Sequence, residues 1–287
     1  MTKIVAFSGK KQAGKSTAGN FLFGLQMWTI LHPETNEPLI SSFRIDEKGR
    51  LIIPVDFGPE KGGIQDGIFN PISQEPAVKL FLSELVWPTV KMYSFADSLK
   101  DICAYLFDLS VEQLYGTNEE KNTSTKLIWV DMPGFPKNKS KTKLEELGFK
   151  LSDDWTPDNY MTAREVLQYV GTEIFRKMSF DVWANSTLKN IKTDNSELAI
   201  ITDCRFPNEV KKIQEGGGVV IRFTRAPFKG QDEHASETML DPEVYDWSQF
   251  NAVIDNKEMS IEEQNNKVFE ELVRLEVLEP ETANDLS

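Results

Sequence analysis

Histidine and cysteine are scarce in this 287-residue chain, which has two of each. Cys103 and Cys204 lie far apart and lack Cys-x-x-Cys spacing, and His32 and His234 lie even farther from each other. Because a protein zinc site needs three or four such ligands together, the sequence indicates neither a zinc site nor a redox pair. A reducing compartment fits this cysteine usage best.

A hydrophobic span and an excess of positive charge are missing as well. No run of 18 apolar residues occurs, and the first residues, MTKIVAFSGKK, become polar too early for a signal peptide. The 45 acidic residues outnumber the 32 Lys and Arg residues, so the net charge is −13. This charge opposes attraction to nucleic acid or to an anionic membrane, and we expect neither as a partner. A homodimer is compatible with the sequence.

Short apolar runs alternate with helical segments along much of the chain. This alternation predicts an α/β fold built on a parallel sheet with helices on its faces, in a single domain over residues 1–287. Capping-box spacing at Thr162 with Glu165 and at Ser260 with Glu263 predicts two helix starts, and Gly216 predicts a helix end. The predicted strands are Lys3–Gly9, Val90–Phe95, Leu198–Asp203, Val219–Thr224 and Ala252–Asp255.

Two segments interrupt the alternation and are predicted to be insertions, at about residues 28–89 and 116–159. The first contains SFRIDEKGRLIIPVDF, which predicts a β-hairpin that turns at Glu47–Gly49. The second carries the lysine run KNKSKTK, for which a solvated loop is a better interpretation than a binding patch.

The stretch SGKKQAGKST, Ser8–Thr17, matches the pattern Gly-x-x-x-x-Gly-Lys-Ser/Thr and joins a predicted strand to a predicted helix. Glycines allow successive backbone N–H groups to turn toward one anion, at the positive end of the helix dipole. Lys15 is expected to reach the β- and γ-phosphates of ATP, and the Ser16 hydroxyl to hold Mg²⁺. The alternative is a plain strand-to-helix turn. The residues of this loop expected to bind ATP are Gly9, Lys10, Ala13, Gly14, Lys15, Ser16 and Thr17.

Arginines are concentrated in the second half of the chain, where five of the eight lie between Arg164 and Arg225. Guanidinium groups match phosphate oxygens bidentately and stabilise charge that develops in phosphoryl transfer. Salt bridges on an acidic protein are the alternative use. The scarcity of histidine favours a phosphate as acceptor, because a phosphate monoester is already ionised at neutral pH whereas a hydroxyl usually needs a base. Asp97 or Asp203 is the alternative base for a hydroxyl acceptor.

The stretch LAIITDCRFPNEV ends an apolar strand in Asp203 and continues to Arg205 and Glu209. Charged groups at the carboxyl end of such a strand lie where α/β sheets bind ligands, so Asp203 is expected to place the metal or contact substrate. An aspartate that caps a helix N-terminus or lies in a turn is the alternative. Cys204 stands where many ATP-hydrolysing machines have a glutamate that activates water, which disfavours a motor ATPase.

The stretch TAREVLQYVGTEIFRKMSFDVW carries a second polar set. Spacing of three to four predicts that Arg164, Gln168 and Gly171 or Thr172 share one face of a helix. A glycine inside a helix costs about 1 kcal/mol relative to alanine, so Gly171 indicates close approach of a neighbour or ligand. Trp183 is expected in the core, with stacking on a base as the alternative.

With these motifs identified, the sequence resembles the bacteriophage deoxynucleoside monophosphate kinases, a branch of the P-loop nucleotide kinases. The resemblance follows, in order, the stretches FSGKKQAGKST, YSFADSLKDI, REVLQYVGTEIFRKMSFDVW, ITDCRFPNEV and DEHASE. It implies a P-loop NTPase fold of the nucleoside-kinase type, with a five-stranded parallel sheet flanked by helices. For a viral chain it implies the host cytoplasm.

The resemblance also assigns roles to matching positions. Asp97 and Lys100 are expected near the monophosphate, and Arg225 in a lid over the phosphates at about residues 225–245. The catalytic residues are expected to be Lys15, Arg164, Arg176 and Arg205, and the metal ligands Ser16 and Asp203. The substrate-binding set comprises Asp97, Lys100, Arg164, Gln168, Gly171, Thr172, Arg176, Asp181, Trp183, Asp203, Arg205, Asn208 and Glu209.

We therefore expect phosphorylation of deoxynucleoside 5′-monophosphates to diphosphates by ATP and Mg²⁺. One alternative is a P-loop kinase of another small phosphorylated or hydroxyl-bearing metabolite. From a different class, the alternative is a nucleotide-binding regulatory or DNA-associated ATPase. The insertions are longer than such a kinase core requires, so the base that is accepted stays open.

Overall fold

In this computed structural model, the described residues are 2–31, 43–56, 58, 60, 62–135, 141–227 and 238–279. The backbone divides into two compact units. The first, here called the sheet unit, comprises Met1–Ser94, Leu188–Lys229 and Leu240–Ser287. The second, here called the helical unit, comprises Phe95–Thr187 and Gly230–Met239. Organisation of residues 1–287 as a single domain stays a prediction.

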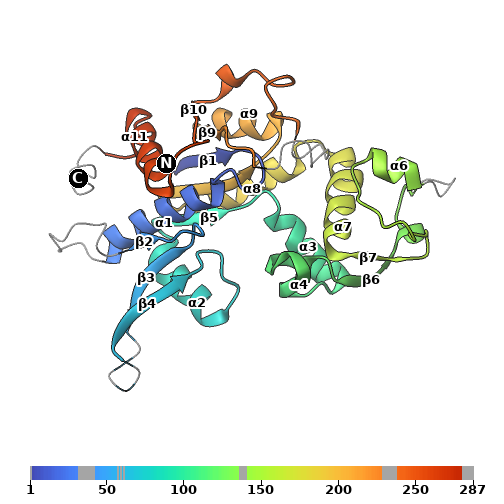
Figure 1. The fold of residues 1–287 in the computed structure, drawn as a ribbon, viewed down its shortest axis with the longest axis horizontal. Helices are drawn as coiled ribbons and strands as arrows, with labels where there is room; N and C mark the ends of the chain where they lie inside the picture. Colours follow the sequence, from blue (N-terminus) through green and yellow to red (C-terminus); the bar gives the residue numbers. More distant parts are fainter. Residues whose placement is uncertain are drawn as a thin grey trace. The chain divides into compact units, whose positions relative to one another are not determined.

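A five-stranded, all-parallel sheet forms the centre of the sheet unit, in the order β10–β9–β1–β8–β5 (Figure 1). Apolar side chains on both faces of such a sheet are covered by helices, which explains why its strands are continuous hydrophobic runs. The predicted α/β class and all five predicted strands are confirmed. The strands are β1 (Lys3–Ser8), β5 (Val90–Tyr93), β8 (Leu198–Cys204), β9 (Val219–Phe223) and β10 (Ala252–Ile254).

Helices α1 (Lys15–Leu31) and α11 (Ile261–Arg274) pack against each other and against the sheet (Figure 1). Their shared core buries Phe7 and Ile221 of the sheet with Leu22 of α1 and Val268 of α11. Helix α9 (Pro207–Glu215) contacts β9, and α8 (Val182–Asp194) contributes residues to both units. The predicted capping box at Ser260 and Glu263 and the helix end at Gly216 are both confirmed. Among the described residues, no helix is long and apolar enough to cross a membrane.

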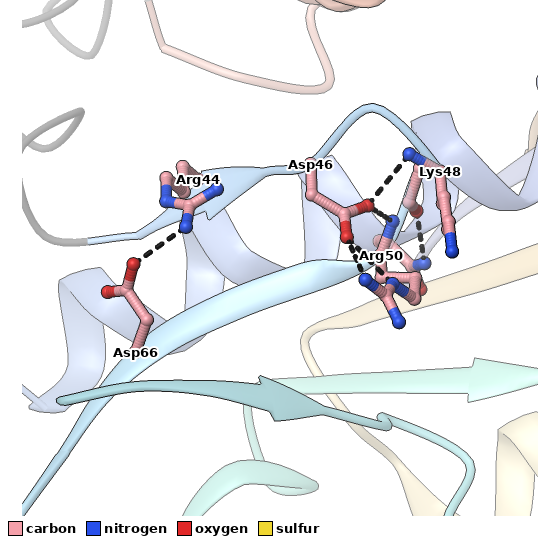
Figure 2. Close-up of polar contacts among 7 residues, drawn as sticks. Arg44, Asp46, Lys48, Arg50 and Asp66 are labelled. Atoms are coloured by element: carbon pink, nitrogen blue, oxygen red, sulfur yellow. Dashed lines mark hydrogen bonds and ion pairs between the residues drawn. The ribbon is translucent and has the colours of Figure 1, made fainter.

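The first insertion forms a three-stranded antiparallel sheet beside α1, made of β2 (Arg44–Ile45), β3 (Leu51–Asp56) and β4 (Ile64–Phe69). The predicted hairpin is therefore confirmed, and β4 adds a third strand. Its turn is closed by a hydrogen bond from the Gly49 N–H to the Asp46 carbonyl at 2.8 Å. Figure 2 shows the Asp46 carboxylate accepting from the Lys48 and Arg50 backbones and from the Arg50 guanidinium.

This turn is docked on the helix that follows the phosphate loop. The Asn20 side chain of α1 donates to the Gly49 carbonyl at 2.8 Å. A Cβ on Gly49 would lie 2.2 Å from Thr17 Oγ1, and the Gly49 φ of +76° is one that other residues rarely adopt. The rest of this insertion includes α2 (Pro76–Phe81) and the π-helical turn η3 (Leu82–Val86).

The helical unit is built from short elements around an aromatic cluster. Trp129 packs edge-on against Phe149, Trp155 and Tyr169, with ring centroids 5.0, 6.1 and 6.0 Å away. The second insertion thus supplies much of this unit's core. The elements of the helical unit are α3 (Asp97–Phe107), α4 (Val111–Tyr115), α5 (Asn118–Lys121), β6 (Ser124–Ile128), η4 (Trp129–Asp131), α6 (Lys141–Glu146), β7 (Tyr160–Thr162), α7 (Ala163–Gln168) and η5 (Tyr169–Arg176).

Part of the predicted lysine-run loop is helical instead. Residues 136–140 lie outside the described residues, but Lys141–Glu146 form α6. Lys141 lies 3.8 Å from the Glu145 carboxylate and 3.9 Å from that of Asp153, and it donates to the Ser152 carbonyl. Lys141, in the described part of the run, thus has two acidic neighbours. These contacts stabilise a helix where composition predicted a loop.

Candidate active site

The phosphate loop joins β1 to α1 in the sheet unit, as predicted. Gly14 has a φ of +99°, and a Cβ there would lie 2.2 Å from Gln264 Oε1, so both conformation and space require glycine. The Lys15 side chain is buried, and its ammonium group donates to the Gly9 carbonyl at 2.7 Å and to the Lys10 carbonyl at 2.6 Å. Two carbonyl groups at the start of the loop therefore hold the lysine amine in place.

Other loop residues are also fixed by specific partners. Lys10 forms an ion pair with Asp241 at 2.6 Å. Asp241 lies 3.8 Å from the buried guanidinium of Arg222, which donates to Ser8 Oγ at 3.0 Å. Neither Asp241 nor Arg222 was among the predicted site residues, although an arginine inside the apolar strand VVIRF was a visible signal. Ala13 is buried, Ser16 is exposed and Thr17 is half-buried.

Asp203 lies at the carboxyl-terminal end of the sheet's strands, where the loop begins. It was predicted at the end of β8, but the strand continues through Cys204, so Asp203 is its penultimate residue. The registers of β1 and β8 pair Ser8 with Cys204, which places this end of β8 beside the start of the loop. Asp203 accepts a hydrogen bond from Ser94 Oγ at 2.5 Å. The N-cap alternative is wrong, because Phe206 is the N-cap residue of α9.

The oxygen donors at this end of the sheet suit Mg²⁺. That ion prefers oxygen ligands and is usually held by one or two side chains together with substrate phosphates. The Ser16 hydroxyl and the Asp203 carboxylate, on the two segments that meet here, are of this type. Within the described part of the chain, no three His, Cys, Asp or Glu residues gather into a metal-binding group.

The turn from β8 into α9 is organised by Glu209. This side chain is 1% exposed, and its carboxylate accepts from the Arg205 N–H at 2.8 Å and the Phe206 N–H at 3.1 Å. Glu209, predicted to contact substrate, thus holds the backbone that presents Arg205. Asn208 is half-buried on the same helix. Burial, followed by the nearby carboxylates of Glu209 and Asp203, raises the pKa of the Cys204 thiol well above its ordinary value, so this thiol is no nucleophile.

Arg225 begins the segment predicted to be a lid, at about residues 225–245. Its backbone N–H donates to Asn256 Oδ1 at 3.0 Å, and its guanidinium donates to the Met259 carbonyl at 2.5 Å. Residues 228–237, which include the DEHASE motif, lie outside the described residues. The lid therefore stays a prediction.

Arg164 lies in the helical unit, on α7, and is held by the second insertion. Its guanidinium donates to Asn122 Oδ1 at 3.0 Å and to Asn118 Oδ1 at 2.8 Å. Partial burial, and then the positive charges of Lys100 and Arg164, lower the pKa of Lys121. Lys100, Lys121 and Arg164 are therefore close enough for their positive charges to interact. Sequence reasoning missed Lys121, because nothing local distinguishes it from the other lysines of the insertion.

Asp97 and Lys100 lie on α3, around the ring of Tyr115. The Lys100 ammonium lies 4.0 Å from that ring's centroid. Burial first, and then the charges of Asp97 and Asp101, raise the pKa of the Tyr115 hydroxyl. The two residues predicted near the monophosphate are therefore neighbours of one aromatic side chain.

The helix expected to carry Arg164, Gln168 and Gly171 or Thr172 on one face changes type after Gln168, where α7 continues as the π-helix η5. The shared face of these residues stays a prediction. The expected close approach at Gly171 is confirmed, since a Cβ would lie 2.8 Å from Leu99 Cδ2 of α3.

Trp183 lies in the core, as expected from its apolar surroundings. It is 4% exposed, packs against Phe175 with ring centroids 5.4 Å apart, and donates from Nε1 to the Gly171 carbonyl at 3.1 Å. Its indole N–H is thus used within the unit. The remaining residues predicted here, Thr172, Arg176 and Asp181, are half-buried.

The phosphate loop follows the central strand of a parallel sheet, and Asp203 is the penultimate residue of the neighbouring strand; this arrangement is typical of P-loop nucleotide-binding proteins, the class that includes the nucleotide kinases. Within that class, the chain belongs to the deoxynucleotide monophosphate kinase family, whose family model matches residues 101–268. The resemblance seen in the sequence is thereby confirmed. The chain is a kinase that transfers phosphate to a nucleotide. The loop at residues 9–16 precedes the matched segment, so its assignment depends on its own pattern and geometry.

Two viral relatives are similar to this chain. A provisionally named deoxynucleotide monophosphate kinase of Acanthamoeba polyphaga mimivirus is 32% identical over 160 residues, covering 51% of this chain and 67% of that protein. The deoxynucleoside-5′-monophosphate kinase of Escherichia phage T5 is 37% identical over 57 residues, covering 20% of this chain and 23% of that protein.

Proposed function

We propose that this chain transfers the γ-phosphoryl group of ATP, with Mg²⁺, to a deoxynucleoside 5′-monophosphate and releases ADP and the deoxynucleoside diphosphate. The family match supports the acceptor class, and both relatives are named for this activity. The observation that carries the donor side is the phosphate loop, with Lys15 held across it and Asp203 at the adjoining strand end.

On the donor side, the loop N–H groups and Lys15 bind the β- and γ-phosphates. Ser16 and Asp203 hold Mg²⁺, which neutralises charge on the phosphates. Arg225 contributes to ATP binding. The loop, its lysine and the cation act mainly by position and charge, because phosphoryl transfer leaves little covalent work to the protein.

On the acceptor side, Arg164, Arg176 and Lys100 bind the phosphate of the monophosphate, together with Lys121. The concentrated charge of Lys100, Lys121 and Arg164 supports this role, since an anionic substrate of a protein with net charge −13 needs local positive charge. Arg205, held at the β8–α9 turn, stabilises the charge of the transferring group. The acceptor phosphate is already ionised, so the reaction needs no histidine base.

The remaining substrate contacts of this proposal are Asp97, Gln168, Gly171, Thr172, Asp181, Trp183, Asn208 and Glu209. We place the enzyme in the host cytoplasm, in keeping with its viral relatives, with no direct contact to nucleic acid. A homodimer is compatible with the proposal.

A coupled ADP-release assay tests this function. It combines ATP and Mg²⁺ with a panel of nucleoside and deoxynucleoside monophosphates. We expect ADP release to depend on at least one deoxynucleoside monophosphate and to identify the accepted bases. If no monophosphate raises ADP release above background, the proposal is wrong. Hydrolysis stimulated by DNA and not by monophosphates would favour the ATPase alternative.

A further inference from the structure

Two buried amide side chains lie against the outer side of the phosphate loop. Asn256 follows β10 by two residues and is 0% exposed. Gln264 lies in the first turns of α11 and is 1% exposed. Both are far from the loop in sequence, and neither is among the predicted site residues. A buried amide is costly unless it is hydrogen-bonded, so the partners of these two side chains indicate their use.

Those partners are the carbonyl groups of the loop. Asn256 Nδ2 donates to the Ala13 carbonyl at 2.8 Å and to Gln264 Oε1 at 2.6 Å. Gln264 Nε2 donates to the Gly14 carbonyl at 3.3 Å, while the same carbonyl accepts the first helical bond from the Ala18 N–H at 3.0 Å. The two amides therefore form one connected network on two successive loop peptides.

The direction of these bonds fixes the direction of the loop N–H groups. In a trans peptide, the C=O of one residue and the N–H of the next point in opposite directions. Carbonyls of Ala13 and Gly14 held on the α11 side turn the N–H groups of Gly14 and Lys15 to the opposite side. Backbone N–H groups that converge on a phosphate in this way are what gives such a loop its affinity.

The glycine of the loop pattern and the position of Gln264 are also linked, through Gly14. The Gln264 side chain occupies the place where a Cβ on residue 14 would lie, at 2.2 Å from its Oε1. Gly14 thus gives the loop its backbone freedom. Its missing side chain also leaves room for Gln264 to reach the Gly14 carbonyl. Asn256 Oδ1 in addition accepts from the Arg225 N–H at 3.0 Å, so the same network reaches the start of the proposed lid.

We propose that Asn256 and Gln264 are positioning residues of the phosphate loop, which set the N–H groups of Gly14 and Lys15 for the polyphosphate of the donor nucleotide. The inference deepens the proposed function and rests on it, because it assumes that the loop binds ATP. It assigns part of the donor site to α11, on the far side of the loop from the phosphates.

The test compares Gln264→Met with Asn265→Leu. Methionine keeps the length of glutamine but cannot donate to the Gly14 carbonyl. Asn265, the next residue on α11, is 5% exposed and has no hydrogen bond to the loop among the described residues, so it matches Gln264 in burial and in loss of polarity. The readouts are the Kd of Mg-ATP, the KM values for ATP and for the accepted monophosphate, and the Tm without ligand.

We expect Gln264→Met to weaken Mg-ATP binding and raise the KM for ATP by about fivefold to tenfold, the effect of one or two neutral hydrogen bonds. The KM for the monophosphate should change less than about twofold, and Asn265→Leu should leave the Kd of Mg-ATP unchanged whatever its Tm. If Gln264→Met does not fold, Gln264→Asn keeps a buried amide that is one methylene too short to reach the loop, and the same Kd shift is expected.

An unchanged Kd of Mg-ATP in a folded Gln264 variant, even with a lower Tm, would overturn the inference and leave only a structural role. An equal rise in Kd for Asn265→Leu would also overturn it. If the wild-type chain itself fails to bind Mg-ATP, the proposed function fails first, so the two failures are distinguishable.

Discussion

The sheet unit and the helical unit present their candidate phosphate-binding groups in different ways. In the sheet unit, these groups are mainly backbone N–H groups of a glycine loop, whose carbonyls are held by the buried side chains of Asn256 and Gln264. In the helical unit, they are charged side chains on short elements, such as Arg164 held by two asparagines of the second insertion.

The difference indicates how each group is specified. Backbone donors need a particular chain path, which a regular sheet and its glycines supply. Such donors contact phosphates, so they can serve nucleotides with almost any base. Side-chain ions depend on local packing, so they can change as the insertion around them changes. We infer that the sheet unit holds the general chemistry of the donor and that the helical unit holds selectivity for the acceptor. The predictions below test this separation.

The largest effect is expected at the loop lysine. Lys15→Ala removes a cation from the proposed β- and γ-phosphate site, and turnover should fall by about 10³-fold, as for loss of a key electrostatic group. The Tm should stay close to wild type, because the hydrogen bonds from the amine to the Gly9 and Lys10 carbonyls lie within the loop itself. Steady-state ADP release and a thermal melt measure both. Lys211→Ala, on the surface of α9, is the control, and retained activity in Lys15→Ala would contradict the role of the loop.

The next effect concerns the cations of the helical unit. Arg164→Ala and Lys121→Ala each remove a proposed charged contact to the monophosphate, so the KM for that substrate should rise by about 10- to 100-fold with little change in the KM for ATP. Initial rates with each substrate varied in turn separate the two constants. Lys126→Ala, whose ion pair with Asp108 is exposed, should change neither. A rise confined to the KM for ATP would break the comparison between the units.

Arg205 sharpens the comparison, because it lies in the sheet unit but is proposed to act on the acceptor and the transferring group. Arg205→Ala should reduce kcat/KM for the monophosphate by about tenfold or more while the Kd of Mg-ATP stays within about twofold. Calorimetry measures the Kd of Mg-ATP, and a rate assay measures kcat/KM for the monophosphate. An unchanged acceptor KM and kcat would place this arginine outside the site. Loss of ATP affinity alone would mean that Arg205, like the loop, binds the donor nucleotide.

The smallest effects are on stability, and they test packing in each unit. Gly49→Ala meets Thr17 Oγ1 at 2.2 Å, and Gly171→Ala meets Leu99 Cδ2 at 2.8 Å. Each should reduce the free energy of unfolding by about 1–3 kcal/mol, the usual range for overpacking. Gly63→Ala is a matched control for Gly49, because its φ is +72° and nothing lies within 4 Å of its added Cβ. Denaturant melts measure all three, and equal losses at Gly49 and Gly63 would show that conformation and not packing decides.

Much of the sheet unit was predictable because its signals are local. Apolar runs, the glycine loop, the hairpin turn at Gly49 and the capping box at Ser260 each specify structure through neighbouring residues. The roles of Asn256 and Gln264 were not predictable, since both depend on a contact between segments more than 200 residues apart.

The helical unit departs further from what its sequence indicates. The change from α- to π-helix after Gln168 leaves no mark in hydrophobic spacing, so the sequence did not indicate it. The aromatic cluster of Trp129, Phe149 and Trp155 brings together residues scattered through a segment whose composition is mostly polar. Packing of this kind depends on tertiary contacts, which a single sequence does not show.

The docked hairpin turn also offers a site for attaching a fluorescent label. It is held by its backbone and by Asp46, through the Gly49 carbonyl and the amides of Lys48 and Arg50, while the Lys48 side chain is exposed. Both native cysteines are buried. A cysteine introduced at position 48 would therefore be the accessible thiol for a fluorescent label, attached next to the helix that starts at Lys15. Such a label would report nucleotide binding optically, without a coupled enzyme.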